Sequence, residues 1–344
     1  MPHLTFVVPR PAAPSGGHRY NAAVVADWPG SPPSVVELDG PWPLGDRDSL
    51  QQLRAALVGC EVALVDGLVG AAHPDELADA ARSGTRIVLL IHLPLAQEGG
   101  LSEPLRAELA RREERSVREA WRVVTTSATA ARQLATDCGR DDIVAVPPGV
   151  SPAPLAEPHD PPGILQVGSI GPRKNQLATI DALAGCRDFA WTMTFAGPVA
   201  DEAYARRFRS ALDAIGATWT GPLADSELAT AYAHADLMLH PAEAETWGMV
   251  VTEALARGVP VIVAAGTGAV EALGSGTHSR EASAGLPGEA VPLDQPGALS
   301  AALRGWLADP LRRAQWRTNA SNARTGLRRW PMAAGELAHV VRSA

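Results

Sequence analysis

Short apolar runs alternate with longer stretches of helical period along most of this chain. Short runs bounded by Gly, Pro or polar residues predict buried strands, and the longer stretches predict amphipathic helices. Strands that alternate with helices favour parallel, doubly wound sheets covered by helices on both faces. In the first half we expect strands at 4–9, 35–38, 62–66, 86–92, 123–127 and 143–146, and helices from about 20 and at 49–58, 74–82, 103–120 and 128–138.

A second series of the same kind follows residues 147–162, which are too rich in proline for regular structure. We therefore predict a first domain at 1–150, a linker at 151–162 and a second domain at 163–327. Its expected strands are 163–167, 192–196, 218–220, 235–239 and 259–264, and its helices 176–183, 204–215, 225–233, 250–256, 297–308 and one ending near 324, before a last helix from Trp330.

Composition narrows the class of protein. A length of 344 residues suits two domains, and a net charge of −8 argues against a nucleic-acid partner. The three cysteines have no metal or redox spacing, which indicates a reducing compartment, and we expect a cytoplasmic protein. Residues 1–10 lack the basic region of a signal peptide, and no apolar run reaches the length of a membrane span. Lys174 is the only lysine among 30 basic residues, which suggests a high-GC bacterial genome.

Glu245 and Glu253 mark the most informative segment. The pattern places Glu245 on the loop after a buried strand and Glu253 early in the next helix, at the sheet edge where ligands bind in doubly wound folds. Gly248 between them allows close approach of the backbone to a ligand. Two carboxylates there can each bind vicinal hydroxyls of a sugar. The alternative is that acidic residues complement a helix dipole, which explains Glu245 more easily than Glu253.

Arg173 and Lys174 lie on the loop after the first strand of the second domain, just before a helix begins. Cations beside a helix N-terminus form an anion site suited to a diphosphate. The alternative is a solvated turn with two exposed cations. The single lysine, with Gly168 and Gly171 shortly before it and a helix just after it, favours the phosphate site.

Three further features follow strands and have ordinary alternatives. Gly16 and Gly17 could bring backbone N–H groups to a ligand or could form a plain turn. His92, after its buried strand, could touch a reacting sugar or be a structural histidine. Leu223 lies on the loop after the strand at 218–220, which the residues alone indicate only as an ordinary loop.

The segment from Glu245 resembles the Glu-x7-Glu element of retaining glycosyltransferases of the GT-B fold, family 4. The match includes Gly248 and Glu253 and continues to Glu271, with Trp247 where the family usually has Phe. The family often has Arg directly after the first Gly of the phosphate loop, where this chain has Ser169, and Gly where it has Asn175.

The resemblance implies two Rossmann-like domains facing a cleft, with residues 328–344 crossing back to the first domain. It assigns the diphosphate and its departing charge to Arg173 and Lys174, and places His92 and the Gly-rich loop near the donor. It also implies substrate contacts from the loop at Glu245 and from the turn that follows it. The predicted catalytic residues are Arg173, Lys174, Glu245 and His92. The predicted binding residues are Gly16, Gly17, Ser169, Leu223, Thr246, Trp247, Gly248, Met249, Val250 and Glu253.

The sequence therefore predicts a hexosyltransferase that uses a nucleoside-diphosphate sugar, with uracil as the expected base and guanine as the alternative. No cofactor or metal is expected: Asp46 and Asp48 have the spacing of an Asp-x-Asp motif, but their first-domain context does not fit. The nearly balanced charges of helix 103–120 argue against peripheral membrane contact. The alternatives are a GT-B epimerase or hydrolase and a non-catalytic relative. The donor sugar, the acceptor and the oligomeric state stay open.

Overall fold

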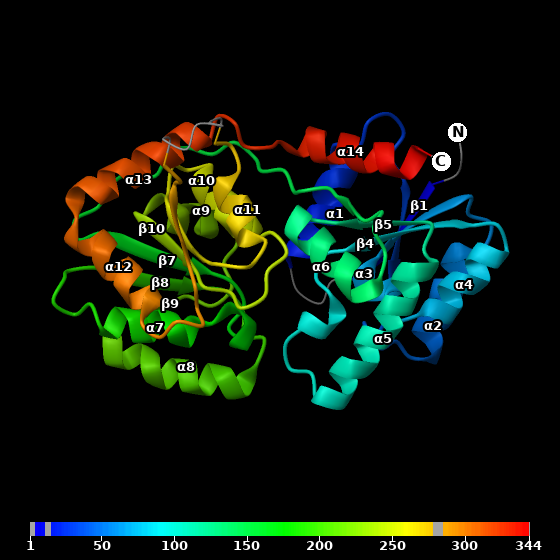
Figure 1. Cartoon of the computed structure of the whole chain (residues 1–344), viewed down its shortest axis with the longest axis horizontal. Helices are drawn as coiled ribbons and strands as arrows, with labels where there is room; N and C mark the ends of the chain where they lie inside the picture. The colour runs from blue at the N-terminus through cyan, green and yellow to red at the C-terminus, as the bar shows by residue number, and fades with distance from the viewer. Residues whose placement is uncertain (1–3, 11–14, 278–284, 344) are drawn as a thin grey trace. The chain divides into compact units, whose positions relative to one another are not determined.

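The computed structural model describes residues 4–10, 15–277 and 285–343. Within these residues the chain forms two compact units. Unit 1 contains the described residues up to Gly149 together with those from Arg329 onward, and unit 2 runs from Val150 to Arg328. The last helix, α14 (Trp330–Arg342), thus belongs to unit 1, where it packs along α1 (Gly16–Ala26; Figure 1).

Unit 1 is built on one parallel sheet with the strand order β2-β1-β3-β4-β5-β6. Its strands are β1 (Leu4–Pro9), β2 (Ser34–Leu38), β3 (Val62–Asp66), β4 (Arg86–Ile91), β5 (Arg122–Thr125) and β6 (Val144–Ala145). Besides α1 and α14, its helices are α2 (Arg47–Leu57), α3 (Gly67–Gly70), α4 (Pro74–Arg82), η1 (Leu95–Gln97), α5 (Glu103–Glu119) and α6 (Ala128–Cys138).

Unit 2 is built on a second parallel sheet with the order β12-β11-β10-β7-β8-β9. Its strands are β7 (Gly163–Val167), β8 (Thr192–Ala196), β9 (Thr218–Trp219), β10 (Leu237–His240), β11 (Val261–Ala264) and β12 (Gly288–Val291). Its helices are η2 (Pro172–Lys174), α7 (Gln176–Ala184), α8 (Glu202–Ile215), α9 (Asp225–Ala233), α10 (Met249–Leu255), α11 (Ala269–Gly274), α12 (Ala298–Ala308) and α13 (Pro310–Ala323).

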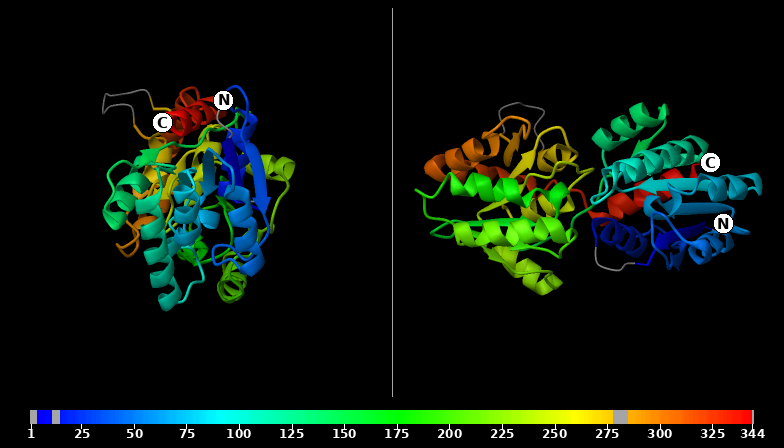
Figure 2. Two further views of the ribbon diagram at one scale, coloured as in Figure 1. Left: turned by 90° about the vertical axis from the view of Figure 1, so that its right-hand side faces the viewer. Right: turned by 90° about the horizontal axis from the view of Figure 1, so that it is seen from below.

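Both faces of each sheet are covered by helices, as the views in Figures 1 and 2 show. In unit 2 successive strand residues enter different cores: Leu239 and Ile262 pack in one cluster, whereas Met238 and Val261 pack in the other. This division follows from the alternation of side chains along a strand. It explains why the central strands read as continuous apolar runs. The predicted fold class, two doubly wound domains with a returning last helix, is confirmed.

The strand order changes direction once in each unit. In unit 1 the change lies between β1 and β3, and in unit 2 between β7 and β10. At such a point the loops from neighbouring strands leave toward opposite faces and open a crevice outside the carboxyl ends of the strands. Residues just after β1, β3, β7 and β10 are therefore the ones the fold offers to a ligand.

Some element boundaries differ from those expected. Helix α1 begins at Gly16 instead of about Tyr20, because the Ser15 side chain accepts the backbone N–H of His18 and starts the helix earlier. Strand β10 extends to His240, which the pattern left in a loop. The short elements α3, α11 and β12 were not predicted, since their few residues give no clear period.

Residues 151–162 contain no helix or strand, as expected, yet they are fastened to unit 2. Ala156 donates its N–H to the carbonyl of Arg257 at 2.9 Å, and Arg324 donates to the carbonyl of Ala153 at 2.6 Å. Asp236 accepts the N–H of His159 at 3.2 Å. The proline-rich segment is therefore an irregular strap along unit 2, because its own carbonyls and N–H groups find partners there.

Candidate active site

The candidate site of unit 2 is built at the change in strand order between β7 and β10. Two loops meet there, 168–175 after β7 and 241–248 after β10. They are joined through the backbone, because the N–H of Glu243 donates to the carbonyl of Arg173 at 2.9 Å. The second loop is also tied to the start of α11, where the N–H of Gly268 donates to the carbonyl of Glu245 at 2.8 Å.

Two buried glutamines hold the first loop in shape. Gln166, near the end of β7, donates to the carbonyl of Lys174 at 2.8 Å. Gln176, at the start of α7, donates to the carbonyl of Ser169 at 2.9 Å and accepts the N–H of Gly171 at 3.3 Å. Both side chains are almost fully buried, so these bonds are shielded from water. The loop that carries the two cations is thus fixed from both ends.

The central feature of the site is a charged cluster around Glu245. One carboxylate oxygen of Glu245 contacts the ammonium of Lys174, lies 3.1 Å from Nε2 of His240 and lies 3.9 Å from the Arg173 guanidinium. Arg173 also donates to the carbonyl of Ala244 at 3.2 Å. Two cations face one carboxylate, so the cluster carries an excess of positive charge.

The charge states of the cluster follow from its neighbours. Burial opposes ionisation of Glu245, but Lys174, His240 and Arg173 outweigh it and hold the pKa of this carboxyl well below its usual range. Burial also lowers the pKa of His240, which is 1% exposed. An ionised carboxylate can only accept hydrogen bonds, so the neutral His240 ring donates from Nε2.

Gly248 completes the turn into α10 and has a positive φ of 84°. A Cβ added there would lie 3.2 Å from Nε2 of His240 and 3.4 Å from Cγ of Glu245. A larger residue would therefore strain the backbone and press on the charged cluster. The glycine that the sequence singled out is needed for this packing.

Glu253 lies on α10 and has a hydrogen-bond partner outside the charged cluster. The buried hydroxyl of Tyr232, on α9, donates to its carboxylate at 2.8 Å. The Arg257 guanidinium lies over the Tyr232 ring, 4.6 Å from its centroid. Glu253 is half-buried, so its carboxylate lies near the surface of the unit. The hydrogen bond from Tyr232 orients it there.

The other predicted residues of unit 2 are placed as follows. Trp247 is buried in the core beside Val251 instead of lying open at the surface, and Thr246 is also buried. Met249 and Val250 form the first turn of α10 and are half-buried. Leu223 is half-buried on the loop after β9.

The predicted residues of unit 1 come together at the carboxyl edge of its own sheet. Gly16 and Gly17 form the first turn of α1, and His92 follows β4 directly. A Cβ added to Gly17 would lie 3.0 Å from Cδ2 of His92, so the glycine lets the ring pack against the helix. Asp46 belongs to no such group: its side chain accepts the N–H of Ser49 at 2.9 Å and caps α2.

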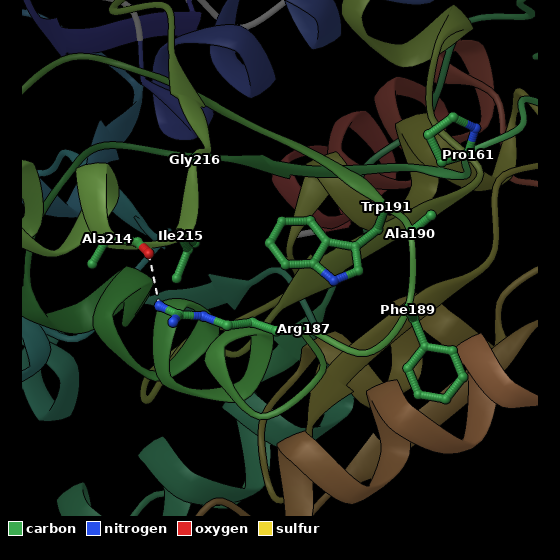
Figure 3. Close-up of a pocket in the computed structure, with 8 residues that line it drawn as sticks. All are labelled: Pro161, Arg187, Phe189, Ala190, Trp191, Ala214, Ile215 and Gly216. Carbon is green, nitrogen blue, oxygen red and sulfur yellow. Dashed lines mark hydrogen bonds between the residues drawn. The ribbon is translucent and has the colours of Figure 1, made fainter.

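A separate hollow lies elsewhere on unit 2 (Figure 3). It encloses about 450 Å³ beside Trp191, Phe189 and Arg187, whose guanidinium donates to the carbonyl of Ala214 at 2.7 Å. Trp191 precedes β8, so the hollow lies where strands begin, at the edge opposite the charged cluster.

In the described part of the chain, no group of three or more His, Cys, Asp or Glu side chains is placed to hold a metal ion. Within residues 4–10, 15–277 and 285–343, no helix is both long and apolar enough to cross a membrane.

Residues that sequence reasoning missed do much of the positioning. His240, Gln166 and Asp66 are each polar residues at or near the end of an otherwise apolar, buried strand. A polar residue in that place is a signal that could have been used, because the carboxyl end of such a strand leads to the ligand crevice. Tyr232 gave no such signal, since it sits in an ordinary helical position.

Comparison with known proteins identifies a family for each half of the chain. Residues 150–323 match the family Glycosyl transferases group 1, and residues 3–153 match Glycosyltransferase Family 4. A D-inositol 3-phosphate glycosyltransferase from Kineococcus radiotolerans is 30% identical over 259 residues, which are 67% of this chain and 58% of that protein. A GDP-mannose-dependent alpha-mannosyltransferase from Corynebacterium glutamicum is 33% identical over 134 residues, 38% of this chain and 31% of that protein.

Solved structures share the fold over nearly the whole chain. HepE of Anabaena in complex with UDP and glucose superposes with a TM-score of 0.74 at 16% identity, covering 99% of this chain and 100% of that one. Sucrose-phosphate synthase of Thermosynechococcus elongatus gives a TM-score of 0.76 at 19% identity, covering 99% and 98%. With its two doubly wound units and with both halves matched by family, the chain belongs to the glycosyl transferases group 1 family.

Proposed function

We propose that this protein transfers a hexose from a nucleoside-diphosphate sugar to an acceptor hydroxyl, with retention of anomeric configuration and without a metal ion. The observation that carries the proposal is the cluster of Arg173, Lys174, Glu245 and His240 at the change in strand order of unit 2. The D-inositol 3-phosphate glycosyltransferase and the mannosyltransferase among its relatives support the class of reaction.

The two cations would serve the diphosphate. When the bond between the anomeric carbon and the diphosphate oxygen breaks, negative charge develops on that oxygen. Arg173 and Lys174 are held by the braced loop and would stabilise this charge in the transition state, supported by the N-terminus of α7. A new bond forms from the acceptor oxygen to the same carbon on the same face, and the acceptor proton passes to the departing phosphate. No divalent ion is required for this step.

The two glutamates would divide the donor between them. Glu253, oriented by Tyr232, would accept hydrogen bonds from the ribose hydroxyls. Glu245, held by His240 and the cations, would accept a hydrogen bond from a sugar hydroxyl. Because its pKa is held low, Glu245 stays ionised and acts as an acceptor over the whole physiological range.

Uracil is the proposed base, and guanine is the alternative. HepE of Anabaena binds UDP and glucose, which supports uracil. The Corynebacterium relative is a GDP-mannose-dependent enzyme, which supports guanine. Both bases therefore belong in the first binding experiment. We also propose a bacterial cytoplasmic setting, which the three free, buried cysteines support.

Calorimetry with UDP and GDP, and with their glucose and mannose conjugates, tests the site. We expect the wild-type protein to bind one nucleotide series, and Lys174→Ala to weaken it about 10-fold or more, since a charge-assisted hydrogen bond contributes about 1.5–3 kcal/mol. Arg187→Ala, in the separate hollow, is the matched control and should bind as wild type. Equal affinity of Lys174→Ala and wild type would refute the phosphate assignment.

The stereochemistry and the metal independence need a second experiment. Proton NMR of the product formed from an α-linked donor in excess EDTA should show an α-linked product. A β-linked product would contradict retention. Loss of activity in EDTA with recovery in Mg²⁺ or Mn²⁺ would contradict the metal-free mechanism. Turnover of the donor without an acceptor would favour the epimerase or hydrolase alternative.

A further inference from the structure

A second polar group lies in unit 1, at the change in strand order between β1 and β3. It consists of Asn21 on α1, Asp66 at the end of β3 and His92 directly after β4. Asn21 and Asp66 are 6% and 4% exposed, and the His92 side chain is 17% exposed. The fold thus brings a buried amide and a buried carboxyl to a histidine at its ligand-binding edge.

The carboxyl group sets the orientation of the amide. Asp66 accepts the N–H of Leu68 at 2.8 Å with one oxygen and the Asn21 amide nitrogen at 2.6 Å with the other. Burial alone would raise the pKa of Asp66, but hydrogen bonds from His92, Asn21 and Leu68 lower it below its usual value. An ionised carboxylate accepts only, so the NH₂ end of the amide must face Asp66.

The amide in turn sets the proton of the ring. With its nitrogen turned toward Asp66, Asn21 presents its oxygen to Nε2 of His92 at 2.9 Å. The same Nε2 lies 3.4 Å from a carboxylate oxygen of Asp66. Both neighbours of Nε2 are acceptors, so Nε2 must carry a proton. In a neutral ring the lone pair is then on Nδ1.

Two further contacts hold the ring in place. Tyr20 packs edge-on to it, with the ring centroids 5.1 Å apart, and is itself buried. Gly17, which also lies on α1, is so close that an added Cβ would reach 3.0 Å from the ring. The ring is therefore oriented by packing as well as by hydrogen bonds.

We propose that Asp66 and Asn21 are positioning residues that fix His92 in the Nε2–H tautomer, so that Nδ1 acts as the acceptor for a hydroxyl of the bound sugar. The Asn21 oxygen is the nearer of the two acceptors at Nε2, and the Asp66 carboxylate fixes which end of the amide faces the ring. The tautomer assignment stands on unit 1 alone. Its use in recognising a sugar hydroxyl rests on the proposed function.

Nitrogen NMR of ¹⁵N-histidine-labelled protein at pH 8 tests the tautomer directly. The His92 signal is identified by its loss in His92→Gln. We expect a protonated Nε2 and an unprotonated Nδ1 in the wild-type protein, and a mixture of tautomers in Asn21→Ala. A proton on Nδ1 of the wild-type ring would overturn the proposal, and this measurement decides even if Asn21→Ala does not fold. An unchanged tautomer in a folded Asn21→Ala would overturn the role of Asn21.

Kinetics test the use of the tautomer. Loss of the partner that orients a metal-bound histidine costs about 10–100-fold in activity, and by analogy we expect Asn21→Ala to lower kcat/KM for the donor by about 10-fold. Gln133→Ala is the matched control, since this exposed amide also donates to a carboxylate, that of Asp137, at 2.9 Å. Unchanged kcat/KM in Asn21→Ala would overturn the link to substrate. If the wild-type protein transferred no sugar from any donor, the proposed function would fail, whereas the NMR result would still decide the tautomer.

Discussion

Glu113 in unit 1 and Glu245 in unit 2 are both buried carboxyl groups, and burial affects them in opposite ways. Glu113, on α5, is 4% exposed, and its two oxygens accept only the N–H of Leu95, at 3.1 and 3.2 Å, among the contacts found for it. Burial raises its pKa to about 7. The Glu245 side chain is 12% exposed, yet its pKa is well below the usual range.

The difference lies in the neighbours. Glu245 faces Lys174, Arg173 and His240, whereas the charged groups that act on Glu113, Asp137 and Glu98, are acidic. A cation in contact with a carboxylate offsets the free-energy cost of removing that carboxylate from water. A single backbone N–H offsets this cost only in part. Depth of burial alone therefore does not determine whether a carboxyl group is ionised in this protein. The sign of the surrounding charge does.

Removing the cation should make Glu245 resemble Glu113. Lys174→Met leaves a buried carboxylate without its nearest partner, and such a change destabilises proteins by about 3–5 kcal/mol. Because Arg173 stays at 3.9 Å, we expect a loss near the lower end, about 3–4 kcal/mol, in urea unfolding at pH 7.5.

The double variant Lys174→Met/Glu245→Gln is the control for that loss. It removes the uncompensated charge and should recover most of the stability. If Lys174→Met alone were as stable as the wild type, the ion pair would contribute nothing to the fold, and the comparison with Glu113 would fail.

Neutralising Glu113 should change the pH dependence of stability. Its pKa is raised from 4.5 in the unfolded chain to about 7, so the folded state binds more protons between these values and stability falls as pH rises through this window. This contribution is about 3–3.5 kcal/mol in total. Glu113→Gln should remove that part of the slope between pH 4.5 and 8.

Glu114→Gln is the matched control on the same helix. Glu114 is more exposed and pairs with Arg118 at 2.7 Å. Its substitution should leave the slope unchanged. A Glu113→Gln protein with the wild-type slope would mean that Glu113 is already ionised in the folded state.

The two glutamates of unit 2 should separate in binding. Glu253→Ala should weaken free UDP or GDP about 10-fold, or about 1.4 kcal/mol, because the ribose loses an acceptor. Glu245→Ala should bind free nucleotide at least as well as wild type, since the cations lose a competing carboxylate, but should bind the nucleotide sugar more weakly. Wild-type nucleotide affinity in both variants would refute the ribose role.

Asn175 offers the smallest effect. It has a left-handed φ of 55° at the end of the loop that carries Lys174. Asn175→Ala should lower the unfolding free energy by about 1 kcal/mol, because alanine adopts the left-handed conformation less readily than asparagine. Asn175→Gly should change it by less than about 0.5 kcal/mol. Equal stability of the alanine variant would show that the loop relaxes.

The fold could be read largely from the sequence because its signals are local. Apolar runs such as 62–66 and 86–91 are long enough to mark strands, and the spacing of Glu245 and Glu253 predicts a ligand loop. Short elements such as α11 and β12 span too few residues to show a period.

The contacts within the site depend on tertiary structure and could not be read in the same way. Lys174 and Glu245 are 71 positions apart, and Asn21 and His92 are also 71 apart. Neither pair has a sequence pattern of its own. Lys174 and Glu245 meet because the sheet order places β7 beside β10. Asn21 and His92 meet because α1 follows β1 and His92 follows β4, the strands on either side of β3 in the other sheet. Polar residues at the ends of apolar strands indicate which side chains contribute to the site. Only the topology shows which residues they contact.

The return of α14 to unit 1 has a consequence for protein synthesis. A ribosome completes all of unit 2 before it reaches Trp330, whose ring packs edge-on against Tyr20 at 5.8 Å between centroids. Tyr20 in turn packs against His92. During translation unit 2 can therefore reach its folded state while the His92 edge of unit 1 still lacks its final support. Unit 2 would mature first on the nascent chain, and the histidine edge of unit 1 would mature last.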